Sequence, residues 1–197
     1  MSDFLPKNYE APKSGGSYMK LQQGENRVRV LSAAIVGEEY WTTENKPVRT
    51  KTLPQDKPHN IKLRDPSKHW LSGVKHFWAF VVQDKSGGGI KILEITQASI
   101  QNTITGLVKD EDWGNPSNYD LVITRTGEGM ETRYEVTPKP HSPIDVEVLK
   151  EYESMNINLD ALYEGGDPFG GSTKKESPTT EHKTEEGEKI NVSDLPF

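Results

Sequence analysis

The chain has 197 residues, enough for one compact domain or at most two. It contains no cysteine, which excludes disulfides, thiol catalysis and cysteine-ligated metal sites, and no apolar run approaches the ~18 residues of a membrane-spanning helix. The net charge of −6 is unevenly distributed, because residues 46–91 carry ten Lys or Arg against three Asp or Glu. This asymmetry predicts a basic functional face. The missing cysteines and the missing membrane span favour an intracellular protein without a membrane partner.

The first regular element is predicted near residue 25. Residues 1–24 contain prolines and a Ser-Gly-Gly-Ser run, which predict a flexible N-terminal arm. Strict alternation follows and predicts a strand in which Val28 and Val30 lie on a buried face. Arg27 and Arg29 are then expected on a cationic outer face.

Residues 42–73 show no periodic pattern. They contain four prolines and many Lys and Arg residues. The stretch is much longer than the ~4–6 residues of an ordinary connection. Since loops held by a scaffold often carry binding groups, we predict a functional loop here.

The remaining elements are predicted from the spacing of apolar residues, which alternate in strands and recur every three or four residues in helices. Ser142-Pro143 is a typical helix start, with a capping hydroxyl followed by a proline. The predicted elements are a hairpin over residues 75–82 and 90–95, a helix over 97–109, a hairpin over 119–137, and a helix that starts at Ser142.

This order predicts a mainly β protein. The first choice is an OB-fold-like barrel of five or six strands with one or two short helices, and the alternative is an open α+β sheet. The barrel is expected over residues 25–163. Residues 164–197 carry four Lys or Arg against eight Asp or Glu and few large apolar side chains, so we predict a disordered acidic tail.

Aromatic and cationic residues occur together from residue 40 onward. Single-stranded nucleic acid is bound by this mixture, since unpaired bases stack on rings while phosphates pair with Lys and Arg. Trp41 and Trp70 are expected to be exposed, whereas Phe80 and one of Phe77 or Trp78 are expected in the core. The candidate DNA-binding residues are Arg27, Arg29, Tyr40, Trp41, Arg49, Lys51, Lys62, Arg64, Trp70, Lys75, Phe77 and Trp78.

Other site chemistry has little support in the sequence. His59, His69 and His76 lack the spacing of a zinc site. The turn Ser86–Gly89 lacks the Gly-Lys-Ser/Thr ending of a phosphate-binding loop. We therefore predict no metal, no cofactor and no catalytic residue, and the protein is not expected to be an enzyme.

The last four residues are Asp194, Leu195, Pro196 and Phe197. They place an apolar wedge beside the Asp194 carboxylate and the terminal carboxylate, which suits a basic-rimmed pocket on another protein. We predict a partner-docking tip, and the alternative is a tail end without a partner.

Several stretches resemble phage-encoded single-stranded DNA-binding proteins of the OB-fold type. They are FLPKNYEAP (4–12), YMKLQQGENRVRVLS (18–32), EYWTTENKPVR (39–49), KHFWAFVV (75–82), KILEITQASI (91–100) and YDLVITRTGEGMETRYEV (119–136). Separately, SDLPF (193–197) resembles the acidic, Pro-Phe-ending tip of bacterial and phage single-stranded DNA-binding proteins.

The resemblance implies roles in DNA replication, recombination and repair in the cytoplasm of an infected bacterial host. It also implies that the tip docks polymerases, helicases or nucleases. Some phage relatives carry a zinc module with cysteine ligands, and because this chain has no cysteine, zinc is not carried over.

Two functions from other classes stay open at this point. A metal-dependent nuclease could use the same basic groove, but it would need a convergent cluster of acids that the sequence does not reveal. A protein-interaction module could instead place its basic face against an acidic protein. Nothing in the sequence predicts an oligomeric state.

Overall fold

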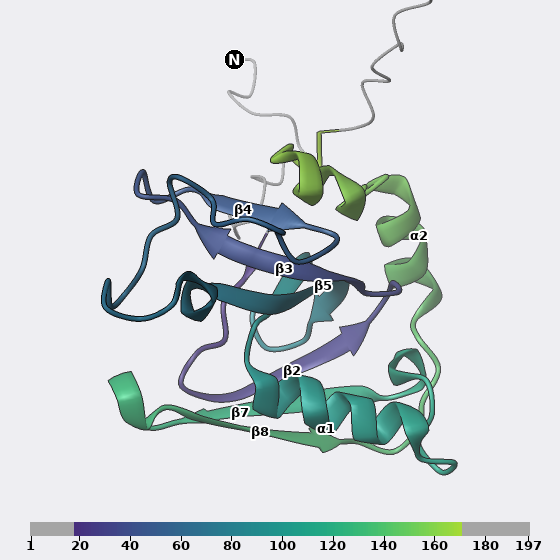
Figure 1. Ribbon diagram of the computed structural model, residues 1–197. Coiled ribbons are helices and arrows are strands. Elements are labelled where there is room, and N and C mark those ends of the chain that lie inside the picture. Colours follow the sequence, from purple (N-terminus) through teal and green to yellow (C-terminus); the bar gives the residue numbers. More distant parts are fainter. Residues whose placement is uncertain (1–17, 171–197) are drawn as a thin grey trace, which may run out of the picture.

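The computed structural model describes residues 18–170, which form one eight-stranded sheet with a few short helices (Figure 1). The strands are β1 (Tyr18–Met19), β2 (Gly24–Val30), β3 (Ile35–Trp41), β4 (Pro47–Thr50), β5 (Val74–Asp84), β6 (Ile90–Ile95), β7 (Asp120–Thr126) and β8 (Arg133–Pro138). The helices are α1 (Ala98–Lys109), α2 (Val146–Ser154) and the 3-10 turns η1 (Trp70–Gly73), η2 (Pro116–Asn118), η3 (Gly129–Glu131) and η4 (Leu159–Glu164). The prediction of a mainly β fold is confirmed.

Strand β5 is the centre of the sheet. Along one edge it pairs with β3 and then with β2, and along the other edge it pairs with β6. Strand β2 also pairs with β7, and β7 with β8, all antiparallel. A long bent first strand followed by two hairpins with a helix between them gives an OB-like order, which is typical of a partly open Greek-key barrel.

The predicted barrel does not close. Among residues 18–170 no ladder joins β6 to β8, and we call the gap between these two strands the seam. The free edge of β6 is instead occupied by β1, which pairs with it in parallel through Tyr18 and Met19. Since a strand edge accepts one partner at a time, β8 stays at the edge of the sheet.

The inner core lies between the two halves of the bent sheet. Val28 and Val30 of β2 face Phe80 and Val82 of β5, as their alternation predicted, and Ile104 of α1 packs against the same cluster. The helix spans almost the predicted residues, with its buried positions on one face.

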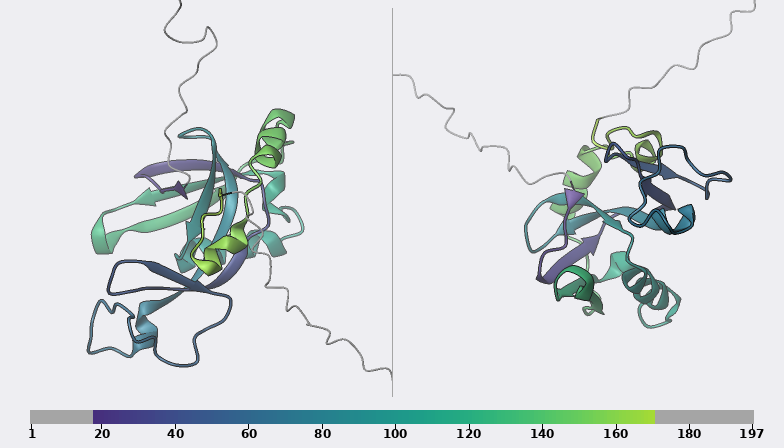
Figure 2. Two further views of the ribbon diagram at one scale, coloured as in Figure 1. Left: turned by 90° about the horizontal axis from the view of Figure 1, so that it is seen from above. Right: turned by 60° about the vertical axis from the view of Figure 1, so that its left-hand side comes forward.

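A second core covers the opposite face of β5. Phe77, Ala79 and Val81 are buried against the segment from α2 to residue 170, which we call the C-terminal strap (Figure 2). Leu159 and Leu162 of η4 supply much of this contact. Central strands buried on both faces have few positions for polar side chains.

The packed body extends beyond both predicted boundaries. Strand β1 lies within the predicted arm, and Phe169 packs on the second core after the predicted end at residue 163. The rest of the arm and the predicted acidic tail, residues 1–17 and 171–197, lie outside the described residues.

Helix α2 begins later than predicted. Ser142 does not cap it, because its carbonyl and hydroxyl oxygens both accept hydrogen bonds from Arg29. Asp145 caps the helix instead, accepting from the Glu147 amide at 2.9 Å. Within residues 18–170 no helix has the length and apolar character needed to cross a bilayer.

Candidate nucleic-acid interface

Residues 42–73, which we call the basic excursion, form an ordered lobe. Thr42 pairs with Ile61 in an isolated bridge, and both residues are buried. Strand β4 pairs with β3 and ties the lobe to the sheet. The excursion and the turn between β7 and β8 project from the same side of the body, at the left of Figure 1. In OB-folds, the loops at these two positions flank the oligonucleotide.

Trp41 ends β3 at the base of the excursion and is 46% exposed. Its indole Nε1 donates a hydrogen bond to Glu39 Oε1 at 3.2 Å. Its carbonyl oxygen accepts from the Lys62 amide at 2.7 Å. Because one hydrogen bond holds the indole and another holds the backbone of Trp41, and the ring still faces solvent, it is a preorganised surface on which a base can stack.

A cavity of about 550 Å³ lies at the seam, and we call it the seam cleft. Its walls come from β1, the β3–β4 hairpin, the end of β6 and β8. The side chains relevant to binding are Tyr18, Lys20, Trp41, Arg49, Glu94 and Tyr134. The fold thus brings together three aromatic residues that are far apart in the sequence.

Arg49 is engaged by carboxylates of the cleft. Its guanidinium lies 3.1 Å from Glu39 and 2.8 Å from Glu94, over the ring of Phe77 at 5.8 Å, and its side chain is 10% exposed. Burial raises the pKa of Glu94 above its ordinary value, although the neighbouring Arg49 opposes this shift. In this arrangement Arg49 joins β4 to β3 and β6.

Arg29 is not on an exposed face, so that prediction is wrong. Its side chain is 1% exposed, and its Nε donates to Asp120 Oδ1 at 2.6 Å. Arg27, half exposed, and Lys85 contact the same carboxylate at 2.7 and 3.2 Å. Burial alone would raise the pKa of Asp120, but hydrogen bonds from Arg29, Lys85 and Arg27 lower it below its ordinary value.

The predicted aromatic residues are divided between core and surface. Phe77 is fully buried in the second core, so its place on a DNA surface is also wrong. Trp78 is half-buried against the inner core and donates its Nε1 hydrogen to His76 Nε2 at 3.2 Å. Tyr40 and Trp70 are half-buried, and neither lines the seam cleft.

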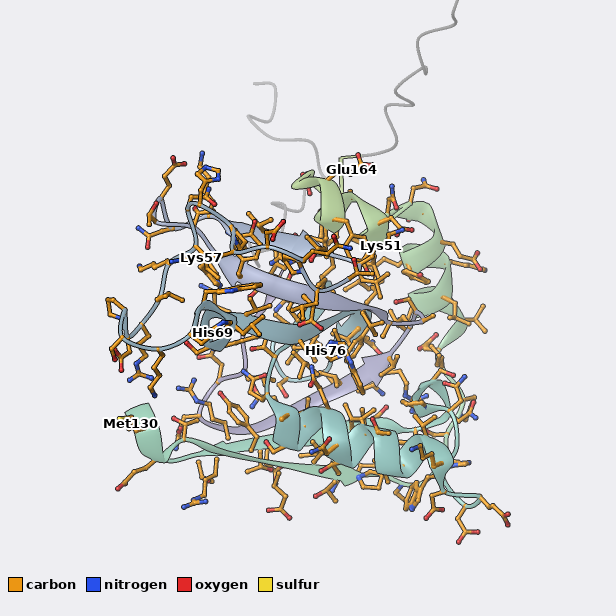
Figure 3. All side chains as sticks on the ribbon, in the orientation of Figure 1. Lys51, Lys57, His69, His76, Met130 and Glu164 are labelled. Atoms are coloured by element: carbon orange, nitrogen blue, oxygen red, sulfur yellow. The ribbon has the colours of Figure 1, made fainter. Side chains whose placement is uncertain are left out.

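The remaining predicted cations are exposed but do not line the cleft. Lys51 contacts Asp160 of the C-terminal strap at 3.4 Å and lies over the Tyr163 ring at 5.0 Å. Figure 3 labels Lys51 on the excursion and Glu164 on the strap. Lys62 bonds Asn45 within the excursion. Arg64 and Lys75 are exposed as well.

Besides Glu94, three cleft residues with the chemistry to contact DNA were missed by the sequence analysis. Tyr134 lies in a correctly predicted hairpin, whose alternation placed it on the apolar face with Val136, so it was not considered as a binding residue. Tyr18 and Lys20 lie in the predicted arm, and a two-residue parallel ladder leaves no periodic signal. The resemblance stretch that begins at residue 18 was the available signal for them.

The structure gives no support for a metal site in its described part. Among residues 18–170 no group of three His, Cys, Asp or Glu side chains is placed to hold an ion. His76 lies 3.2 Å from Glu38, and His69 packs beside Trp70. The three histidines of the excursion region therefore have separate local environments.

Comparisons with known proteins give one informative relative. The chain is 25% identical over 148 residues to a protein of Escherichia phage T5 named probable ssDNA-binding protein. The match covers 62% of this chain and 57% of that protein, so the chain spans little more than half of its relative. No family model and no solved structure matches the chain.

Proposed function

We propose that this protein binds single-stranded DNA in the seam cleft, largely without sequence preference. The observation that carries the proposal is the meeting of Tyr18, Trp41 and Tyr134 in one cleft beside a basic excursion. Stacking on aromatic rings accepts any base, and contacts to phosphates carry little sequence information. The name of the phage T5 relative supports the same activity.

The C-terminal strap limits where the DNA can lie. It buries the outer face of β5, which includes Phe77 and Val81. A strand on the sheet would therefore have to use the seam cleft, between the excursion and the β7–β8 turn. The exposed Arg64 and Lys75 are available for phosphate contacts outside the cleft.

Binding should show the signature of phosphate contacts and stacking. The test measures affinity for a labelled single strand and for its duplex over a salt series, with a slope of about −0.7 in log–log form per phosphate neutralised. Trp41→Ala should weaken binding by ~1–3 kcal/mol and leave the slope nearly unchanged. Equal affinity for the duplex, or no dependence on salt, would contradict the proposal.

The same assay separates the other two functions. Repeating it with Mg²⁺ would reveal cleavage if the basic surface served a nuclease. A protein-interaction module would show no DNA binding even at low salt. Intact complexes that prefer the single strand support the binding function alone.

We further propose that the protein acts in phage DNA replication, recombination and repair in the cytoplasm of the infected host. Its tip, Asp194 to Phe197, would recruit polymerases, helicases or nucleases. The acidic, apolar-ended sequence of the tip supports this role. Deleting Phe197 should abolish capture of replication proteins by the full-length chain while DNA affinity is kept.

A further inference from the structure

Strand β1 separates two cavities. Tyr18, Met19 and Lys20 line the seam cleft, and the same residues line a second cavity of about 470 Å³, which we call the β1 cavity. The far wall of the β1 cavity includes Gly87 of the glycine-rich turn and Lys91. Strand β1 is therefore the ridge between two neighbouring hollows.

The ridge is fixed to the body by its short ladder with β6 and by contacts of the residues that follow the ladder. Met19 is buried in the inner core. The Leu21 carbonyl accepts a hydrogen bond from Arg125 at 3.0 Å, and the Gln22 amide donates to Asn26 Oδ1 at 2.7 Å. These contacts hold the backbone of the segment and leave alternate side chains free to face outward.

Two outward side chains of the ridge have the chemistry of a single-strand contact. Tyr18 is 38% exposed, and Lys20 is exposed and next but one along the chain. A tyrosine phenol is uncharged at neutral pH, and burial, with the nearby Glu94, raises the pKa of Tyr18 further. An uncharged ring and an ammonium group at this spacing match a base and its phosphate.

We propose that the bound single strand crosses this ridge from the seam cleft into the β1 cavity, with Tyr18 stacking a base and Lys20 pairing with a phosphate. This inference rests on the proposed function. It adds the direction in which the bound strand leaves the seam cleft and the length of strand that the site holds. The strap closes the outer face of β5, so a strand leaving the cleft has the ridge as its way across the sheet edge. Short oligonucleotides can stay at Trp41 and Tyr134 in the seam cleft, whereas oligonucleotides long enough to cross the ridge must pass over Tyr18 and Lys20 to enter the β1 cavity.

The test uses full-length protein and thymidine oligomers of roughly 4–16 nucleotides, the range expected for one OB domain. Tyr18→Leu keeps apolar bulk on the ridge, and Tyr18→Phe keeps the ring. With long oligomers, Tyr18→Leu should lower affinity about fivefold or more, as expected for one lost stack, while Tyr18→Phe should bind like the wild type.

Lys20→Ala should flatten the salt dependence for long oligomers by about 0.7, the contribution of one phosphate. Lys150→Ala removes an exposed cation from α2 and serves as the matched control. Both ridge effects should be smaller with the shortest oligomers, which can occupy the seam cleft at Trp41 and Tyr134 without crossing the ridge.

A direct readout does not depend on the stability of variants. Oligomers carrying 5-iododeoxyuridine should crosslink on illumination to the peptide that contains Tyr18. If Trp41→Ala weakens binding but neither ridge variant does at any length, and no crosslink reaches Tyr18, the path is wrong while the proposed function stands. If the wild type itself does not bind single strands, the proposed function fails first.

Discussion

At the scale of single residues, the Asp120 carboxylate balances the positive charge of the buried Arg29. It is 1% exposed and lies between Arg29, Arg27 and Lys85. Removing one partner of a buried pair leaves an uncompensated charge, which typically costs ~3–5 kcal/mol. Asp120→Ala should therefore lower the free energy of unfolding by about that amount in urea denaturation.

The exposed Glu135 of β8 gives the control, because Glu135→Ala removes an acid without stranding a cation. Asp120 also predicts a sign for acid sensitivity. Its pKa is lowered in the folded state, so its stabilising contribution is complete above the ordinary value of 3.8 and is lost as the pH falls through the folded value. Asp120→Ala should lack this part of the acid transition, and an unchanged transition would contradict the assignment.

Arg49 holds β4 against β3 and β6 through its ion pairs with Glu39 and Glu94, and this structural role can be distinguished experimentally from phosphate binding. Arg49→Met keeps an unbranched chain over Phe77 but leaves Glu39 and Glu94 without their cation. The wall that carries Trp41 should loosen, so affinity for single strands should fall several-fold without a change in the salt slope.

Arg64→Ala is the matched comparison for Arg49→Met. Arg64 is exposed, and if it contacts a phosphate its loss should flatten the slope by about 0.7. If Arg49→Met flattens the slope by the same amount, Arg49 is a phosphate contact after all. Circular dichroism at the assay temperature would establish that both variants are folded.

At the scale of elements, the C-terminal strap is part of the folded body. Phe169 packs on the second core, and the Pro168 carbonyl accepts the Asn158 amide at 2.9 Å. A chain ending at residue 170 should melt like the full-length protein. A chain ending at residue 163 loses the half-buried Phe169 side chain and the buried Pro168, and it should be less stable by about 1–2 kcal/mol.

Thermal melts of the two truncated chains, with the full-length protein beside them, provide the measurement. Equal melting temperatures would mean that the strap beyond residue 163 contributes nothing. The comparison also decides where the body ends, which composition alone placed too early.

The sequence predicted those elements whose period reflects burial on one face. The alternation of Val28 and Val30 and the helical spacing of Ile100 and Ile104 identified β2 and α1 correctly. The same alternation misplaced Arg29. Alternation shows which residues share a face of a strand, but it does not show whether another segment covers that face. Arg29 is covered by Ser142, which is 113 positions away in the sequence.

The sequence predicted the types of residue that form the candidate site, but not which of them lie together. Trp41 could be identified because it stands among polar residues at the start of an aperiodic basic stretch. Tyr18 and Tyr134 reach the same cleft only through pairing of β1 with β6 and of β8 with β7. Such long-range pairing has no local signal, so the assembled cleft required the structure.

At the scale of the whole molecule, charge is segregated along the chain. Residues 171–197 carry six Asp or Glu against four Lys, and they continue from the strap that contacts the basic excursion through Lys51 and Asp160. A tethered segment has an effective concentration near millimolar for a short flexible linker. We therefore expect residues 171–197 to compete with DNA for cations on the body.

Deleting residues 171–197 should tighten DNA binding at low salt, and the gain should shrink as added salt screens exposed charges. Deleting Phe197 alone keeps nearly all the charge and should leave the affinity unchanged. Affinities of the two deletions over one salt series provide the measurement. An unchanged affinity after the longer deletion would contradict competition by the tail.

The central position of β2 has a consequence for synthesis on the ribosome. Asn26 of β2 is bonded to Ile123 of β7, 97 positions later. At ~5–20 residues per second, β2 waits roughly 5–20 seconds for this partner, and pairing across such separations is slow in itself. The nascent chain therefore presents a strand with one apolar face, formed by Val28 and Val30, and with an unpaired edge during that interval. The yield of folded protein in a foreign host should therefore rise with slower growth or added chaperone, even if the stability of the folded protein is unchanged.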